Sequence, residues 1–207
     1  MRRVVVVSAG AGSPSSTRKL ADRLRSAVES RLPGTQSSVL DLREIGQDLL
    51  TATTSGLRSE QVDEAIDLVS NADALIAVTP VFNGSFSGLF KLFFDVLDEG
   101  TLRDVPVLLG ATGGTARHSL AIDQAMVPLL FYLRARPLPW PVYAATEDWA
   151  DPRGLDTRVM QAADALVSAL TAADQPSGGR ARTLPSDDFT LTSNLEQMLA
   201  DLGTATS

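Results

Sequence analysis

The chain has 207 residues, of which 44% are apolar and 21% charged, a composition typical of a globular protein with a sizeable core. The net charge of −7 argues against a nucleic-acid partner, because neutralising phosphate groups takes clustered lysine and arginine. The chain has no cysteine and one histidine, which excludes disulfides, thiol chemistry and a His/Cys metal cluster, and fits a reducing, cytoplasmic location.

The amino-terminal residues MRRVVVVSAG combine two arginines with a short apolar run, as a signal peptide does. The run ends after four valines, whereas the apolar region of a signal peptide has roughly 7–15 residues. No segment reaches the roughly 18 apolar residues needed to cross a bilayer. We therefore expect a buried first strand and no association with a membrane.

Apolar runs of strand length alternate with stretches of helical periodicity over most of the chain. The first run is continuous rather than alternating, as expected for a strand that is covered on both faces. The expected strands are residues 4–7, 39–42, 74–78, 105–111 and 140–144, and the expected helices are residues 15–32, 59–70 with Ser59 as the N-cap, 87–98, 119–135 with a kink at Pro128, and 156–172.

This succession of β–α units predicts an α/β fold with a parallel sheet and helices on both faces. For a chain of this size we expect a doubly wound, five-stranded sheet in the order 2-1-3-4-5. In that order the first, third and fourth strands are neighbours, so the loops that follow them open on the edge where such sheets bind ligands. These loops are residues 8–18, 79–88 and 111–119.

The composition changes near residue 174, which predicts three segments. Residues 1–173 form the α/β domain, and residues 174–188 are rich in Pro, Gly and Ser, as linkers are. Residues 189–207 carry apolar side chains at helical spacing, which predicts a C-terminal helical tail.

The first loop brings a cluster of hydroxyl side chains to the beginning of a helix. Free N–H groups at a helix start, together with hydroxyl donors, form an anion site, whereas simple capping would need only one hydroxyl. We therefore predict that this loop binds a phosphate through Ser13, Ser15, Ser16 and Thr17.

The same loop approximates the dinucleotide fingerprint G-x-G-x-x-G. Gly10 and Gly12 occupy the first two glycine positions, Ser15 stands at the third, and Asp41 lies near the place of a ribose-binding acid. Pro14 lengthens the turn, so the match to a pyrophosphate site is poor.

The second loop combines a rigid proline with small residues. Pro80 stiffens the chain as it leaves the strand, and Gly84 lets the backbone approach a flat ligand closely. Phe82 and Phe86 could form an apolar wall, although Phe86 could equally belong to the core. The pentad GSFSG resembles a nucleophile elbow but has Phe86 at its centre, and His118 comes too early for the usual order of a hydrolase triad.

The third loop contains Gly113 and Gly114 between Thr112 and Thr115, so its backbone donors are free to face a ligand. For His118 two roles remain open, a cap for the next helix or a contact at the edge of the ligand.

Three stretches of the sequence, SPSSTRKLA, TPVFNGSFSGLFKLFFD and ATGGTARHSLAIDQAMVPLL, resemble the NAD(P)H-dependent FMN reductases. The likeness covers about residues 3–172 and is greatest to the reductases of two-component flavin monooxygenase systems. It implies a flavodoxin-like fold, FMN and NADPH or NADH as cofactors, and transfer of hydride from nicotinamide to flavin, with no catalytic side chain and no metal.

The resemblance also implies where FMN binds. The phosphate would lie on Ser15, Ser16 and Thr17 beside Ser13, although some relatives have an arginine where this chain has Ser16, and Arg18 follows two positions later. Near Gln124 some relatives have an aromatic residue or a histidine. The residues that would line the flavin ring are Pro80, Val81, Phe82, Asn83, Gly84, Ser85, Thr112, Gly113, Gly114 and His118.

The resemblance implies a flavin reductase that supplies reduced FMN to a partner monooxygenase. A flavodoxin-type electron carrier, or a quinone, azo or chromate reductase, remains an alternative on the same scaffold. Residues 89–97 and 125–133 are apolar almost all round, whereas a helix on a sheet needs only one apolar face. We therefore expect a homodimer or homotetramer; the alternatives are that the two helices bury each other or that the helix at 189–202 folds back over them.

Overall fold

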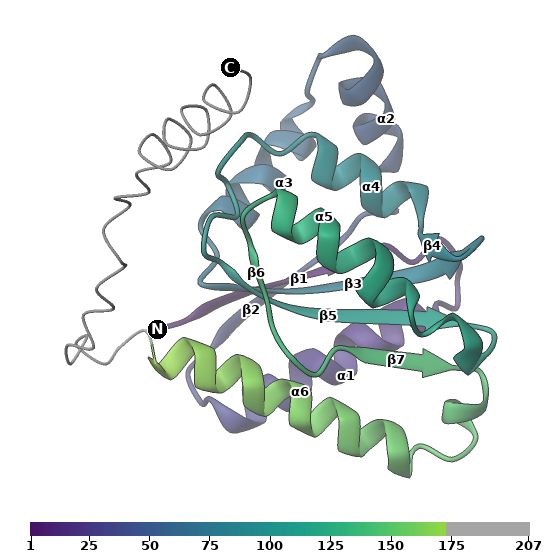
Figure 1. Ribbon diagram of the computed structural model, residues 1–207. Coiled ribbons are helices and arrows are strands. Elements are labelled where there is room, and N and C mark those ends of the chain that lie inside the picture. Colours follow the sequence, from purple (N-terminus) through teal and green to yellow (C-terminus); the bar gives the residue numbers. More distant parts are fainter. Residues whose placement is uncertain (173–207) are drawn as a thin grey trace, which may run out of the picture. The chain divides into compact units, whose positions relative to one another are not determined.

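The computed structural model describes residues 1–172, which form a sheet with helices on both faces (Figure 1). The strands are β1 (Arg3–Ser8), β2 (Gln36–Asp41), β3 (Ala74–Phe82), β4 (Ser85–Phe86), β5 (Pro106–Gly113), β6 (Arg136–Pro137) and β7 (Val142–Ala145). The helices are α1 (Ser16–Arg31), α2 (Gly46–Ser55), α3 (Glu60–Ser70), α4 (Gly88–Asp95), α5 (Val127–Tyr132) and α6 (Arg153–Ala172), with short helical turns η1 (Ala116–His118), η2 (Ile122–Met126) and η3 (Glu147–Trp149).

The main strands are parallel and run in the order β2-β1-β3-β5, and both β6 and β7 pair with the remaining edge of β5. Together β6 and β7 take the place of a single fifth strand, so the predicted fold class and order 2-1-3-4-5 are confirmed. The expected count of five strands was too low, because the fifth strand is divided and β3 carries the short antiparallel partner β4.

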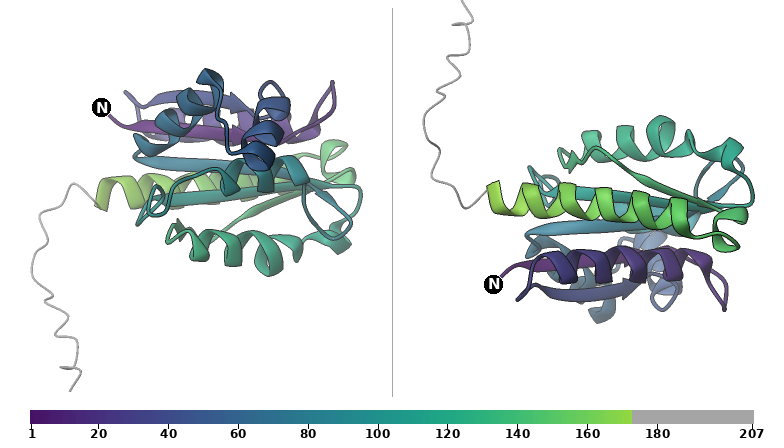
Figure 2. Two further views of the ribbon diagram at one scale, coloured as in Figure 1. Left: turned by 90° about the horizontal axis from the view of Figure 1, so that it is seen from above. Right: turned by 90° about the horizontal axis from the view of Figure 1, so that it is seen from below.

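The four valines of β1 contact the helices on both faces of the sheet. Val5 and Val7 pack with the buried residues of α2, α3, α4 and α5, while Val4 and Val6 pack with those of α1 and α6. Figure 2 shows this division, with α1 and α6 side by side on one face and the other helices on the opposite face. A strand buried on both faces needs an apolar residue at each of its buried central positions, as β1 has from Val4 to Val7.

Serine side chains mark the beginnings of three helices. Ser15 accepts a hydrogen bond from Arg18 N, Ser87 from Phe90 N, and Ser59 from Val62 N, as predicted for Ser59. Each hydroxyl satisfies an N–H group that has no partner inside its helix.

The segment expected to form one kinked helix over residues 119–135 is divided instead. Residues Ile122–Met126 form a π-helical turn, and α5 begins only at Val127. Pro128 lies in the first turn of α5, where its missing N–H costs no hydrogen bond, so it does not kink a continuous helix as predicted.

No helix within residues 1–172 is long and apolar enough to cross a membrane. The predicted linker at 174–188 and the predicted helical tail at 189–207 lie outside the described residues.

Candidate functional site

The three loops singled out in the sequence leave the sheet at one edge, on the right of Figure 1. Ser8 at the end of β1 pairs with Val78 of β3, and Pro80 of β3 pairs with Thr112 of β5. The three strands therefore end close together in space, and the loops that follow them are neighbours. This is the position at which open α/β sheets bind ligands.

The first loop presents free donors at the start of α1. The N–H groups of Ser16 and Thr17 donate to no acceptor within residues 1–172, and the side chains of Ser13 and Ser16 are exposed. Ser15 is half-buried, and its hydroxyl accepts from Arg18 N at 3.1 Å. A Cβ on Gly10 would lie 2.1 Å from that hydroxyl, so only glycine at this position leaves room for Ser15, the N-cap of α1.

Thr17 plays a structural part that the sequence did not suggest. Its side chain is 2% exposed, and its hydroxyl lies 2.8 Å from the hydroxyl of Thr112, which is 3% exposed. The bond joins the first turn of α1 to the end of β5, and so the first loop to the third. The Thr17 hydroxyl is therefore already engaged, whereas its backbone N–H remains free.

The acidic residue considered for a ribose is also engaged. Asp41 Oδ2 accepts from Arg18 Nη1 at 3.4 Å, and its Oδ1 accepts from Arg43 N at 3.3 Å. Arg18 forms a second ion pair with Asp22 at 3.1 Å. These contacts reduce the capacity of Asp41 to bind a ribose and so count further against the dinucleotide interpretation of this loop.

The second loop is a tight β-hairpin. Val81 pairs with Phe86 and Phe82 with Ser85, and the turn between the two strands has positive φ angles of 49° at Asn83 and 80° at Gly84. Asn-Gly is the sequence preferred in such two-residue turns. Gly84 is thus required by the turn itself.

The two phenylalanines of the hairpin differ in environment. Phe82 is 54% exposed beside the turn, so its ring is available to a ligand. Phe86 is half-buried, and its ring centroid lies 5.6 Å from that of Phe90 in the core. Phe86 thus belongs mainly to the core.

Two buried hydroxyl groups hold the base of the hairpin, and the sequence analysis missed both. Thr79 Oγ1 accepts from Ser87 N at 3.0 Å and lies 3.3 Å from Ser87 Oγ, which caps α4. Thr79 and Ser87 flank the hairpin in the sequence, and two hydroxyl residues in such positions were the signal that could have predicted this contact.

The third loop is held by Tyr143 of β7, which was also missed. The Tyr143 hydroxyl donates to Thr115 O at 2.9 Å, and a Cβ on Gly113 would lie 2.1 Å from that hydroxyl. Burial, followed by the nearby Asp148 carboxylate, raises the pKa of Tyr143, so the hydroxyl keeps its proton and remains a donor. The tyrosine thus occupies the space that the absent side chain of Gly113 leaves.

The rest of the third loop is open. Gly114 is exposed with no atom near its potential Cβ position, and the N–H groups of Gly114 and Thr115 donate to no acceptor within the described residues. Thr115, not His118, caps the turn η1, because its hydroxyl accepts from Arg117 N. His118 is exposed at the same edge of the sheet.

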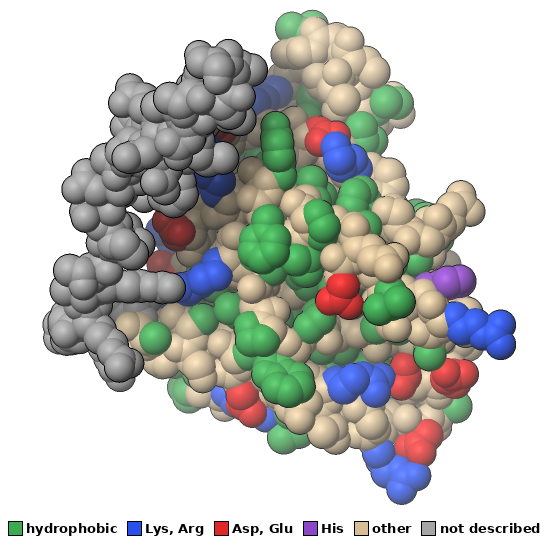
Figure 3. Space-filling model, in the orientation of Figure 1, with side chains coloured by type: hydrophobic (Ala, Val, Ile, Leu, Met, Phe, Trp, Pro, Cys, Tyr) green, Lys and Arg blue, Asp and Glu red, His purple; other side chains and the backbone are tan. Residues whose placement is uncertain are grey.

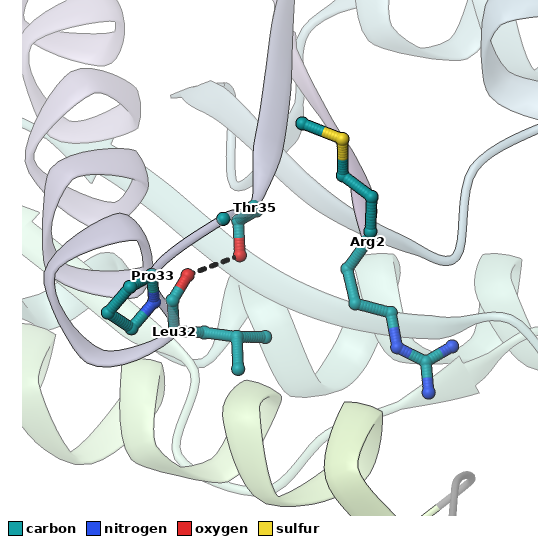
Figure 4. Close-up of a pocket in the computed structure, with 6 residues that line it drawn as sticks. Arg2, Leu32, Pro33 and Thr35 are labelled. Carbon is teal, nitrogen blue, oxygen red and sulfur yellow. Dashed lines mark hydrogen bonds between the residues drawn. The ribbon is translucent and has the colours of Figure 1, made fainter.

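A hollow at the opposite edge of the sheet has none of these features (Figure 4). It is lined by Met1, Arg2 and residues 32–35, and Thr35 Oγ1 donates to Leu32 O across it at 2.7 Å. This hollow adjoins the start of β1, so it lies away from the three loops.

Comparison with known proteins accounts for the arrangement. The model of the family described as NADPH-dependent FMN reductase matches residues 2–150. The chain belongs to this family. It is therefore an oxidoreductase that uses FMN together with a reduced nicotinamide nucleotide.

Individual relatives support this assignment. The chain is 37% identical over 168 residues to the NADH-dependent FMN reductase SfnE of Pseudomonas putida, a match that covers 79% of this chain and 90% of the relative. It is also 37% identical over 151 residues to an FMN reductase (NADPH) of Pseudomonas aeruginosa, covering 73% and 81%. The solved structure of an oxidoreductase from Corynebacterium diphtheriae is 42% identical with a TM-score of 0.78, covering 83% of this chain and 98% of that one.

The donors at this edge fit the chemical groups of FMN. A phosphate needs several N–H and O–H donors, which the start of α1 offers. A flavin ring needs an apolar wall and donors at its polar edge, which Phe82 and the free N–H groups of Gly114 and Thr115 offer.

Proposed function

We propose that this protein reduces FMN with NADH or NADPH, with the FMN phosphate at the first loop and the flavin ring between the second and third loops. The observation that carries the proposal is the convergence of three loops at one sheet edge, with unpaired backbone donors in the first and the third. The proposed ligands are Ser13, Ser15, Ser16 and Thr17 for the phosphate, and Pro80, Val81, Phe82, Asn83, Gly84, Ser85, Thr112, Gly113, Gly114 and His118 for the ring.

The residues of the first loop divide the binding of the phosphate between them. Ser16 donates through both its N–H group and its hydroxyl, while Thr17 donates through its N–H group alone, because its hydroxyl is buried against Thr112 and away from the loop surface. Ser15 accepts from Arg18 N and can still donate its own hydroxyl proton. The positive end of the α1 dipole favours the anion at this place.

The second and third loops orient the ring. Phe82 forms an apolar wall on one side, and the N–H groups of Gly114 and Thr115 face the polar edge, where they stabilise negative charge. When bound, the flavin and the nicotinamide supply the redox chemistry themselves, so the protein contributes binding and orientation and needs no acid or base side chain.

A titration of the purified full-length protein tests this proposal. FMN should bind more tightly than riboflavin, which lacks the phosphate, and the protein with FMN should oxidise NADH or NADPH. Equal affinities for FMN and riboflavin would contradict the phosphate site. Binding of FMN without oxidation of either nucleotide would favour an electron carrier instead. Comparing the two nucleotides also determines which one is preferred, since the relatives above include an NADH-dependent and an NADPH-dependent reductase.

The proposal includes a homodimer or homotetramer, because the surface over α4 and α5 is apolar (Figure 3). Phe131 is 63% and Tyr132 86% exposed on α5, and a groove between the two helices is lined by Phe94, Leu129 and Leu133 among others. A second copy of the chain that covers this face would remove large apolar side chains from water.

Light scattering on the full-length chain tests the oligomer. The wild type should be larger than a monomer at micromolar concentration, and replacing Phe131 and Tyr132 by serine should shift it toward the monomer. A monomeric wild type would contradict the proposal. An oligomer that survives both substitutions would place the interface on another face.

The proposal also includes delivery of reduced FMN to a partner monooxygenase in the cytoplasm, supported by the resemblance noted in the sequence and by a composition without cysteine. Delivery requires reduced FMN to leave the protein. Anaerobic titration should therefore show weaker binding of reduced than of oxidised FMN, and the opposite order would contradict delivery.

A further inference from the structure

The phosphate of FMN brings roughly two negative charges to the first loop. The first turn of α1 carries two cations, Arg18 and Lys19, and the Arg18 guanidinium is already paired with the carboxylates of Asp22 and Asp41. Lys19, the next residue, lies 5.0 Å from the centroid of the Trp149 ring, so its ammonium group is directed toward η3. The charge of the phosphate thus needs a cation from outside α1.

Arg43 lies in the segment that follows β2, and β2 pairs with β1 up to its last residue. Its Nη1 donates to the carbonyl oxygen of Gly12, in the middle of the first loop, at 3.3 Å. The side chain is exposed, and it forms no ion pair within residues 1–172. The guanidinium is therefore a cation that contacts the phosphate loop without a carboxylate to neutralise it.

The backbone of Arg43 is fixed as well. Its N–H donates to Asp41 Oδ1, and Asp41 Oδ2 holds Arg18, so a single carboxylate orients the beginning of the segment and withdraws Arg18 from the phosphate. One N–H group of the guanidinium is used on Gly12, and the others remain available for the phosphate. Arginine is well suited to this task, because its planar fork matches the oxygens of a phosphate.

We propose that Arg43 is the residue that recognises the charge of the FMN phosphate in this protein. The proposal rests on the placement of the phosphate at the first loop. The segment after β2 would then supply the positive charge that the first loop and α1 do not, and the hydrogen bond from Arg43 to Gly12 would hold the guanidinium in place.

The test is the substitution Arg43→Gln in the full-length protein, with Arg103→Gln as the matched control. Arg103 is exposed and precedes β5, so its replacement changes the net charge equally but at the opposite edge of the sheet. Binding of FMN and of riboflavin is followed by quenching of flavin fluorescence at low and high salt. Arg43→Gln should weaken FMN binding by about tenfold or more and riboflavin binding by less than about twofold. Arg103→Gln should change neither.

Salt gives a second readout, because screening weakens the attraction between an exposed cation and an anion. The affinity of the wild type for FMN should fall with added salt more steeply than that of Arg43→Gln. Arg43→Lys, which keeps the charge, should recover part of the lost affinity.

Two outcomes overturn this proposal alone. If Arg43→Gln binds FMN like the wild type while the wild type still prefers FMN to riboflavin, the phosphate is recognised without Arg43. If the substitution weakens FMN and riboflavin equally, the guanidinium only supports the loop. A wild type that does not distinguish FMN from riboflavin would overturn the placement of the phosphate, and this proposal with it.

Discussion

Replacing the two threonines that join α1 to β5 tests how the site is held together. Thr17 and Thr112 are both nearly inaccessible, and their hydroxyl groups bond to each other at 2.8 Å. Threonine to valine keeps the shape of the side chain and removes only the hydroxyl. Each single substitution leaves the other hydroxyl buried without a partner, which should lower the free energy of unfolding by about 1–3 kcal/mol.

The double substitution Thr17→Val with Thr112→Val should behave differently. It removes both polar groups together and leaves an apolar pair of the same shape, which costs about 1 kcal/mol or less. The double variant should thus be more stable than at least one single variant, so the effects are strongly non-additive. Unfolding in urea, followed by circular dichroism, measures all three. Additive losses in the double variant would refute the view that the two hydroxyl groups satisfy each other.

The FMN affinity of Thr17→Val is then compared with that of Ser16→Ala. The Thr17 hydroxyl is occupied by Thr112, so Thr17→Val should change FMN affinity by less than about threefold once the protein is folded. Ser16 is exposed and its hydroxyl is free, so Ser16→Ala should leave stability unchanged and weaken FMN binding by about tenfold. The reverse pattern would place the phosphate on the inner side of α1.

Three further changes probe the second and third loops. Gly84→Ala places a side chain at a φ of 80°, so it should lower the free energy of unfolding by about 1 kcal/mol and weaken flavin binding. Thermal unfolding and a flavin titration measure the two effects. An unchanged variant would mean that the hairpin turn is not strained by a Cβ. Gly113→Ala should displace the Tyr143 hydroxyl and weaken the binding of FMN and riboflavin alike, whereas a loss confined to FMN would contradict a role at the ring. Because the pKa of Tyr143 is raised in the folded protein, stability should fall as the pH rises above about 10, and this part of the fall should be absent in Tyr143→Phe; identical pH profiles would show that the tyrosine is not responsible.

The sheet and the edge at which the three loops meet could be predicted because both depend on simple periodic patterns. Four consecutive valines in β1 fit only a strand that is buried on both faces, and strand order follows from the number of β–α units. The position of the loops then follows from the order of the strands. Helix α2 was not predicted, because only Leu49 and Ala52 of its ten residues are buried and it therefore shows little periodicity.

The details of the site depend on contacts between residues far apart in the chain, which no local pattern reveals. Nothing near Thr17 indicates that its hydroxyl meets Thr112, and nothing near Gly113 indicates that Tyr143 fills the space above it. The hairpin is a different case, because Asn83-Gly84 is a strong turn signal that was interpreted as a site of ligand approach. Asn83-Gly84 is compatible both with a hairpin turn and with a loop that approaches a ligand. The pairing of β3 with β4 in the structure identifies the hairpin.

The hairpin formed by β3 and β4 has a consequence for how quickly flavin can be exchanged. Its strands pair with each other, its turn has the preferred sequence, and Thr79 and Ser87 fix its base. At the proposed site, the wall for the ring is thus formed before FMN binds, so little conformational entropy would be lost on binding and no segment would have to refold on release. In the proposed function, FMN binds and leaves in every catalytic cycle. A preformed site would speed both steps, because the lifetime of the complex would be set by the contacts to the flavin and not by the motion of a lid.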